Sequence, residues 1–396
     1  MMTRLSPPSA VLLRNCDVFS PAPLGRQDVL LAGGQVVAMA AHLSDPPTDW
    51  PVDTIDLAGR RLIPGLIDGH VHFAGGGGEA GAATRVLPVQ VSHLTLAGVT
   101  TAIGLLGTDT ETRSMAELLA NARGLAEFGL TTYCYTGGYQ VPPKTLTGSV
   151  RGDLVHNDRI VAIGELAISD HRSSQPTLDE LLRLASDAHV SGMITRKAGI
   201  LHLHLGDGSR GLQLIEQALA QAELPARTYH PTHCNRNRRL WQQAKELSAS
   251  GIYVDVTAFA ADEDSLSAAQ AMDDWLRTGL SPDRLTVSSD GGGCLPTFDN
   301  DGNLLHMDVG RSASLLEAVA ELLAMGWRLD QVLPAFTSNV ATLFRLPSKG
   351  RVAVGSDADL VVLGEDGTPW ATLAGGHWLV REGKPLIRGL FEAQDF

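Results

Sequence analysis

Residues 62–73 read LIPGLIDGHVHF, an apolar run that ends in two histidines, His70 and His72. Because side chains alternate across a β-strand, the two imidazoles point to the same face. Two imidazoles on one face form half of a binding site for zinc or a similar divalent ion. The spacing alone is weak evidence, since two polar residues at a strand end would give the same pattern. The apolar surroundings favour the metal site, because a buried strand has little reason to end in two histidines.

Similar apolar runs recur along the chain, separated by amphipathic, helix-like segments. The predicted strands are residues 69–73, 99–106, 131–136, 160–168, 199–205, 227–232, 252–258 and 285–289. Predicted helices include residues 114–128, 178–188, 211–222 and 238–249. This alternation predicts an α/β fold, a (β/α)8 TIM barrel over residues 64–346.

Both ends of the chain carry short strand-like runs between glycine and aspartate turns instead. These runs are residues 10–13, 29–31, 35–39 and 54–56 at the start, and 359–363, 371–374, 376–381 and 385–388 at the end. The two termini of a domain commonly lie close together in space. Residues 1–63 and 347–396 are therefore predicted to form one small β-sandwich domain beside the barrel.

Polar residues fall at the carboxyl ends of the predicted strands, where barrels of this type place their chemistry. Tyr139 lies just past the third strand, Glu165 within the fourth, His204 at the end of the fifth, His233 after the sixth and Asp290 after the eighth. Each signal is moderate when taken alone. Their coincidence at one end of the barrel predicts a metal centre together with the first histidine pair.

Other histidines compete with these candidates. His202 shares the strand face of His204, and His230 lies close to His233. We prefer His204 as ligand because it lies nearer the end of its strand, and we interpret His230 as structural. The histidines that lie on helices, loops or terminal strands are interpreted as structural or exposed; they are His93, His156, His171, His306 and His377.

At this point the sequence resembles the amidohydrolase superfamily and, within it, the isoaspartyl (β-aspartyl) dipeptidases. The resemblance covers nearly the whole chain. It rests on the segments PGLIDGHVHFAGGGGEAG, GVTTAIGLLGTD, YTGGYQVPPKTLTGS, AISDHRSSQP, LGDGS, PTHCNRN, VSSDGGG and VGSDADLVVL. The histidine pair, two later histidines and one aspartate indicate only a metallohydrolase, whereas GGGGEAG, SDHR and THCNR together point to this subfamily.

The resemblance implies a two-metal mechanism. His70 and His72 with Asp290 would hold one metal, and His204 and His233 the second, giving two divalent ions per chain with zinc as the expected metal. A hydroxide that bridges the metals would attack the scissile carbonyl. Asp290 would take its proton and pass it to the leaving amine. Tyr139 would stabilise the developing oxyanion.

The resemblance also implies how a dipeptide substrate is recognised. Glu79 would bind the ammonium group, and backbone N–H groups near Gly77 would approach a carboxylate. Arg172 and Arg236 suit bidentate binding of carboxylates, and Thr108 would add a hydroxyl contact. A lone arginine is more often half of a surface salt bridge, but two arginines beside strand ends at the catalytic rim favour ligand binding.

Two positions depart from the pattern of the subfamily. Many members carry a carboxylated lysine on the fourth strand as the bridge between the metals, and this chain has Glu165 there. Glutamate supplies the same negative charge on a shorter side chain. It would bridge both metals, bind one tightly and the other weakly, or lie protonated without a ligand role; we prefer the bridge. Cys294 stands where relatives tend to carry a substrate-binding serine. The sequence therefore does not determine the exact substrate.

Composition narrows the function further. The formal net charge of -13 argues against nucleic acid or an anionic membrane as partner. The four cysteines are scattered without a C-x-x-C pair, and the N-terminus does not resemble a signal peptide, so we expect a cytoplasmic protein. Relatives suggest a homo-oligomer.

Three hypotheses follow. The preferred one is a metallopeptidase that cleaves β-aspartyl dipeptides. The second keeps the metals but changes the substrate to a cyclic amide or an N-acyl amino acid. The third is a non-catalytic amidohydrolase-like scaffold, which usually lacks several metal ligands, whereas here only Glu165 departs from the expected set.

Overall fold

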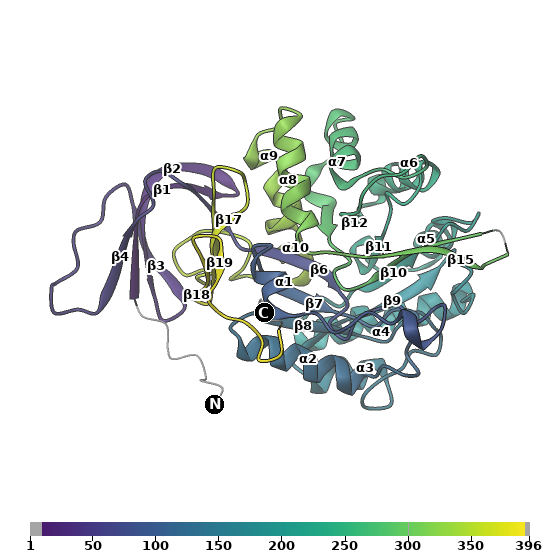
Figure 1. The fold of residues 1–396 in the computed structure, drawn as a ribbon. Helices are drawn as coiled ribbons and strands as arrows, with labels where there is room; N and C mark the ends of the chain where they lie inside the picture. Colours follow the sequence, from purple (N-terminus) through teal and green to yellow (C-terminus); the bar gives the residue numbers. More distant parts are fainter. Residues whose placement is uncertain (1–9, 300, 393–396) are drawn as a thin grey trace.

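The computed structural model describes residues 10–299 and 301–392. Figure 1 shows two regions side by side, a barrel-like assembly of parallel strands surrounded by helices and a sheet built from both ends of the chain. Among the described residues, no helix has the length and apolar character needed to cross a bilayer.

Eight strands of the barrel region follow one another in chain order. Six form one curled parallel sheet, and they are β6 (Leu66–Val71), β7 (Val99–Gly104), β8 (Thr131–Thr136), β9 (Ile160–Ile168), β10 (Leu201–Leu205) and β11 (Tyr229–Thr232). The last two, β12 (Val254–Thr257) and β13 (Leu285–Ser288), pair with each other in parallel. Single backbone hydrogen bonds connect the two sheets, from Cys234 N to Asp255 O at 3.2 Å and from His72 N to Gly291 O at 2.8 Å. The architecture is thus of the (β/α)8 barrel type.

Helices follow most of these strands and cover the outside of the barrel (Figure 1). They are α1 (Val91–Thr95), α2 (Met115–Glu127), α3 (Val150–His156), α4 (Leu178–Thr195), α5 (Gln213–Gln221), α6 (Arg238–Leu247), α7 (Ala268–Arg277), α8 (Ser314–Ala324), α9 (Leu329–Val332) and α10 (Ser338–Phe344). A capping box of Thr177 and Glu180 begins α4 and satisfies its first backbone N–H groups. This helix runs to Thr195, seven residues beyond the predicted end at residue 188.

The predicted strands agree well with the structure where the apolar run is bounded by turns on both sides. Residues 131–136 and 160–168 correspond to β8 and β9 without a shift. The first strand lies earlier than predicted, because His72 bonds to Gly291 rather than continuing the ladder with β7. His72 therefore projects from the turn just after β6, although it still converges with His70.

Strands from both chain ends form one continuous nine-stranded sheet. The N-terminal strands are β1 (Ala10–Ser20), β2 (Ala22–Ala32), β3 (Gln35–Ala40), β4 (Val52–Asp56) and β5 (Arg61–Pro64); the C-terminal strands are β16 (Leu360–Leu363), β17 (Pro369–Ala374), β18 (His377–Arg381) and β19 (Lys384–Pro385). The antiparallel pair of β5 and β16 joins the two groups. The predicted union of the termini is present, whereas the predicted two-layered sandwich is not confirmed by this single connected sheet.

A hairpin that the sequence did not predict follows the last barrel strand. It consists of β14 (Cys294–Phe298) and β15 (Leu304–Val309), which pair in an antiparallel manner. Most of its residues are only partly buried or exposed, so the chain lacks the clear apolar run by which a strand is recognised. The hairpin begins with Cys294 and thus carries one predicted site residue to the barrel rim.

Candidate metal centre and adjoining pocket

The predicted metal ligands meet inside the carboxyl end of the barrel. Their side-chain nitrogens and oxygens form three overlapping buried groups in which all ligand atoms lie within 4.8 Å of one another. The groups are His70, His72 and Glu165; Glu165, His204 and His233; and His70, His233 and Asp290. Residues from strands far apart in the sequence therefore converge as a metal site requires.

Glu165 lies between the two predicted histidine sets. Its Oε2 atom lies 2.9 Å from His70 Nε2 and 3.5 Å from His233 Nε2, and its Oε1 atom lies 3.6 Å from His204 Nδ1. Asp290 completes the cluster, with Oδ1 at 3.0 Å from His72 Nε2 and 3.4 Å from His70 Nε2. The shorter side chain of glutamate thus reaches the ligands of both predicted metals.

The arrangement of the ligand atoms suits a bound cation better than hydrogen bonding among these atoms. His70 Nε2, both carboxylate oxygens of Glu165 and Asp290 Oδ1 are buried and make no hydrogen bond of acceptable geometry within the described part of the chain. Buried polar atoms are nearly always paired, because leaving them unpaired costs free energy. A set of nitrogen and carboxylate ligands that face one another without hydrogen bonds is suited to divalent ions.

Electrostatics keep this cluster anionic. Burial opposes ionisation of Glu165, but the neighbouring His70 and His204 outweigh it and hold the pKa of Glu165 well below its usual value. Burial acts the same way on Asp290, where close contact with His70 and His72 and their charge again lower the pKa. Burial also disfavours charge on His70, yet the two carboxylates raise its pKa well above the ordinary range. Two ionised carboxylates among histidines provide the charge that divalent ions would neutralise.

Two ligands occupy backbone conformations that side chains rarely adopt. His233 has φ 58° and Asp290 has φ 53°, both in the left-handed region. Such conformations cost about 1–3 kcal/mol and persist where the surrounding structure fixes them, often at functional sites. His233 directly follows β11 and Asp290 lies two residues after β13, and in these conformations both side chains join the ligand cluster.

His202 and His230 lie behind the cluster rather than in it. None of the three ligand groups found among the described residues includes either of them. His202 Nε2 lies 2.9 Å from His70 Nδ1, on the side of that ring away from Glu165. Burial lowers the pKa of His202, and burial with charge from His70 lowers the pKa of His230 to about 3, so both rings are neutral.

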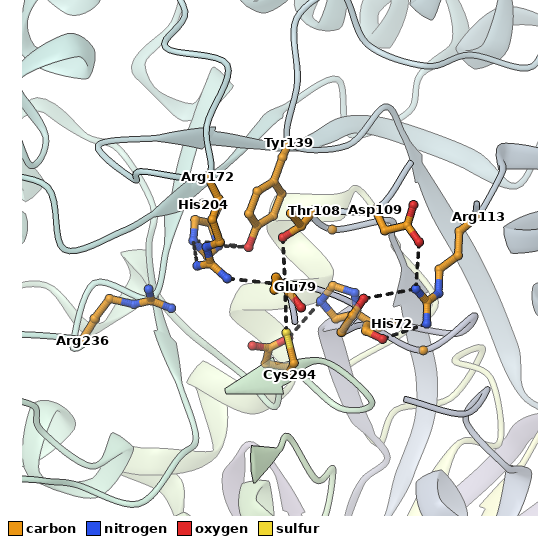
Figure 2. A pocket seen from close by; sticks show the side chains of 15 residues that line it. His72, Glu79, Thr108, Asp109, Arg113, Tyr139, Arg172, His204, Arg236 and Cys294 are labelled. Carbon is orange, nitrogen blue, oxygen red and sulfur yellow. Dashed lines mark hydrogen bonds and ion pairs between the residues drawn. The ribbon is translucent and has the colours of Figure 1, made fainter. Parts of the chain in front are cut away.

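A polar pocket with an empty volume of about 390 Å³, part of it open to solvent, lies outside the metal cluster. It is lined by the predicted site residues His72, Gly77, Glu79, Thr108, Tyr139, Arg172, His204, Arg236, Asp290 and Cys294, and by Gly75, Gly76, Gly107, Asp109 and Arg113. Figure 2 shows the Glu79 carboxylate at the centre of these side chains. The structure therefore brings all the predicted substrate-binding residues together beside the metal cluster.

Glu79 is surrounded by donors. Its Oε1 atom accepts hydrogen bonds from Thr108 Oγ1 at 3.0 Å and from Cys294 Sγ at 3.1 Å, and lies 3.6 Å from Arg172 Nη1. Burial and the charge of Glu79 raise the pKa of Cys294, which keeps the thiol protonated as a donor. A protonated thiol that faces a carboxylate is a poor nucleophile, so this environment does not suit Cys294 as a catalytic thiol.

Tyr139 and His204 form the wall between the pocket and the metal cluster. Tyr139 Oη lies 2.8 Å from His204 Nδ1, and Tyr139 is buried. Burial and the nearby Glu165 carboxylate raise the Tyr139 pKa well above its ordinary value, so the hydroxyl remains protonated. It is thus a permanent hydrogen-bond donor at the edge of the cluster.

Asp170 is a residue of the site that the sequence interpretation missed. Its Oδ2 atom lies 2.9 Å from His204 Nε2 and accepts a hydrogen bond from Arg172 Nη2 at 2.8 Å. A carboxylate behind a metal-binding histidine orients the ring and raises its basicity. The signal was available in the SDHR segment, where Asp170 stands two residues before Arg172.

Arg113 is a second residue of the site that the sequence interpretation missed, and its hydrogen bonds hold the glycine-rich loop in place. Its buried guanidinium donates to the backbone carbonyls of Ala74, Gly76, Gly77 and Val86 at 2.7–3.3 Å. The loop is too close to neighbouring backbone for larger residues, since a Cβ atom at Gly77 would lie 2.3 Å from Thr84 O. Arg113 and the glycines together hold the segment that carries Glu79.

The chain belongs to the amidohydrolase family, whose model matches residues 61–379. Among solved structures, it is similar to the β-aspartyl dipeptidase of Fervidobacterium islandicum AW-1 in complex with β-Asp-Leu dipeptide, with 38% identity, a TM-score of 0.93 and coverage of 98% of this chain and 100% of that chain. A second structure of the dipeptidase from this organism gives 36% identity and a TM-score of 0.88, covering 96% and 100% of the two chains. The predicted resemblance to β-aspartyl dipeptidase-like amidohydrolases is confirmed.

Curated sequences show more distant similarity. Adenine deaminase 2 of Carboxydothermus hydrogenoformans is 23% identical over 392 residues, which are 96% of this chain and 60% of the deaminase. This chain therefore spans less than two thirds of the length of that relative. A similarity at this level of identity does not specify a shared substrate.

Proposed function

We propose that this protein hydrolyses the β-aspartyl isopeptide bond of isoaspartyl dipeptides at a centre of two divalent metal ions. The observation that carries the proposal is the pairing of Glu79 and Arg172, 3.6 Å apart, in the pocket beside the buried ligand cluster. A dipeptide with a free ammonium and free carboxylates can exchange this internal ion pair for two pairs with the ligand.

The chain's own residues account for binding at both ends of such a substrate. Glu79 would accept the ammonium group, assisted by Thr108, which already donates to the carboxylate. Arg172 would bind a carboxylate with its planar guanidinium, and Asp170 holds that group in place at 2.8 Å. Arg236, whose side chain is 20% exposed, would bind a substrate carboxylate at the mouth of the pocket.

His70, His72, His204, His233, Asp290 and Glu165 would hold the two metals, for which zinc is the expected identity. When bound, the metals supply an activated water and a Lewis acid that polarises the scissile carbonyl. Glu165 is proposed as the shared ligand, because its two oxygens face different histidines. A bridging glutamate provides the single negative charge that the carboxylated lysine provides in relatives.

Proton transfer is assigned to Asp290. The residue is ionised and lies beside His72 at the boundary between the cluster and the pocket. In this position Asp290 would take a proton from the attacking water and deliver it to the leaving nitrogen. Tyr139 remains protonated and would donate to the carbonyl oxygen as negative charge develops there.

Metal analysis and substrate comparison test the proposal together. We expect about two equivalents of metal per chain and hydrolysis of β-Asp-Leu, with much slower hydrolysis of α-Asp-Leu, a hydantoin and N-acetyl-leucine. Activity confined to the hydantoin or the acylated amino acid would contradict the dipeptide assignment. Low metal content together with no hydrolysis of any of these substrates would favour the scaffold hypothesis. The cytoplasmic location and the homo-oligomer stay predictions.

A further inference from the structure

A line of side chains crosses the barrel interior behind the metal cluster. His70 Nδ1 lies 2.9 Å from His202 Nε2, and His202 Nδ1 lies 2.9 Å from His230 Nδ1. His230 Nε2 lies 3.1 Å from Thr286 Oγ1, and this hydroxyl donates to Asp255 Oδ1 at 2.6 Å. The line begins on β6 and continues through β10, β11 and β13 to β12, so it connects five of the eight barrel strands.

The line is buried and held in place. All its members are at most 2% exposed. The Tyr135 ring stacks on His202 with 4.8 Å between ring centroids and an interplanar angle of 17°, and the Tyr135 hydroxyl donates to Gly69 O at 2.8 Å. A neutral imidazole has one donor and one acceptor nitrogen, so each ring in the line must point its proton in one direction.

The direction of the donors follows from the two ends. At one end, Asp255 is a carboxylate that already accepts from Thr232 and Ser288 on Oδ2, so Thr286 must donate to Oδ1. The Thr286 oxygen then accepts from His230 Nε2, which leaves His230 Nδ1 as the acceptor for His202 Nδ1. His202 Nε2 in turn accepts the proton of His70 Nδ1. Every hydrogen bond along the line can be satisfied in this one order.

We propose that the His70–His202–His230–Thr286–Asp255 line fixes the tautomer of His70, so that its Nε2 lone pair faces the metal. His202, His230, Thr286 and Asp255 act as positioning residues, since none touches the substrate pocket. The opposite order would place a proton on His70 Nε2, the atom that lies 2.9 Å from Glu165, and would block coordination. Partners behind a ligating histidine commonly change metal affinity by about 10- to 100-fold. This inference rests on the proposed metal centre.

The test replaces one hydroxyl at a time. Thr286→Val breaks the line and keeps the side-chain shape, and we expect zinc affinity to fall by about 10- to 100-fold in competition with a chromogenic chelator. Thr286→Ser restores the hydroxyl and should return the affinity to within about threefold of the wild type. Ser288→Ala removes another hydroxyl from the same Asp255 carboxylate without breaking the line, and its effect should be equally small. Equal losses in Thr286→Val and Ser288→Ala would overturn the inference.

Neutron diffraction from crystals of the zinc-loaded wild-type protein tests the same inference without a variant. We expect hydrogen on His70 Nδ1, His202 Nδ1 and His230 Nε2. Hydrogen on His202 Nε2 would overturn the inference. A wild-type protein that does not bind zinc would contradict the metal centre itself, whereas normal zinc binding with unchanged affinity in Thr286→Val would contradict only the tautomer assignment.

Discussion

Two buried clusters of charge lie at opposite ends of the barrel strands, and they differ in how their charges are satisfied. At the amino end, Lys349 Nζ contacts Thr131 Oγ1 at 2.7 Å and the carboxylates of Asp357 and Asp359. Asp359 also accepts from Gly375 N, at 2.7 Å. At the carboxyl end, both carboxylate oxygens of Glu165 and the Oδ1 atom of Asp290 face histidines. These three oxygens make no hydrogen bond within the described residues.

The difference separates a structural cluster from a ligand site. The three N–H donors of Lys349 match the three oxygens around it, so nothing further is needed to stabilise the charges. Lys349 also joins the segment before β16 to the first residue of β8, which fastens the terminal sheet to the barrel. Buried charged groups without hydrogen-bond partners, as at the carboxyl end, are costly unless a ligand completes the arrangement. This division agrees with the general rule that barrels place stability at one end and chemistry at the other.

Removing the shared ligand at the carboxyl end should have the largest effect. Glu165→Ala should lower metal content below two equivalents and reduce kcat/KM for β-Asp-Leu by at least about 1,000-fold, because bound metals supply several kcal/mol of transition-state stabilisation. Metal content is measured by mass spectrometry of the purified protein. Glu127→Ala, at an exposed position of α2, is the control. Full metal content and rate in Glu165→Ala would remove Glu165 from the centre.

Breaking the amino-end cluster should affect folding instead of metal binding. Lys349→Met leaves two carboxylates without their buried cation, and we expect the free energy of unfolding to fall by about 3–5 kcal/mol. Urea denaturation measures this change, and Lys384→Met on an exposed strand provides the control. If Lys349→Met folded normally but lost its metals, the proposed separation of the two ends would be wrong.

Tyr139→Phe tests the boundary between the cluster and the pocket. Loss of the hydroxyl donor should reduce kcat by about 100- to 1,000-fold, the usual effect of removing one oxyanion donor. Metal content should not change, since the hydroxyl is not a proposed ligand. Tyr133→Phe, on β8, controls for the loss of a partly buried tyrosine hydroxyl outside the site. An unchanged kcat in Tyr139→Phe would exclude the assigned role.

Arg172→Lys tests recognition in the pocket. Lysine keeps the charge but lacks the planar fork, so KM for β-Asp-Leu should rise by about 10- to 100-fold, as expected for one charged hydrogen-bonded contact. The same variant and the wild type should differ little on β-Asp-Leu amide, in which the C-terminal carboxylate is neutral. An equal increase in KM for both substrates would show that Arg172 does not act on the C-terminal carboxylate.

Cys294→Ser should have the smallest effect. A hydroxyl can replace the thiol as donor to Glu79, so we expect kcat/KM to change by no more than about threefold. Steady-state kinetics on β-Asp-Leu measure this. A loss above about 100-fold would instead indicate that the Cys294 thiol acts as a nucleophile, because serine cannot replace a nucleophilic cysteine.

The sequence was informative about strands and their ends. The strands β8 and β9 agree with the predicted residues, since each is a short run rich in β-branched, aromatic or apolar residues. The predicted ligands converge because the carboxyl ends of neighbouring parallel strands must meet at one rim. By contrast, the hairpin of β14 and β15 escaped prediction because its mixed burial leaves no clear periodic pattern. The union of the two termini was predicted, but the order in which their strands pair depends on contacts between distant segments.

By itself, the sequence determined which chemistry is possible. His70, His72, His204, His233 and Asp290 stand at strand ends, and their residue types predict a metal centre. Only the tertiary structure decided how these groups are used: that Glu165 lies between both histidine sets, that Asp170 stands behind His204, and that His202 contacts His70 rather than the cluster. The physical reason is that composition and periodicity report on neighbours along the chain, whereas ligand geometry depends on contacts of about 3 Å between residues 34 to 132 positions apart.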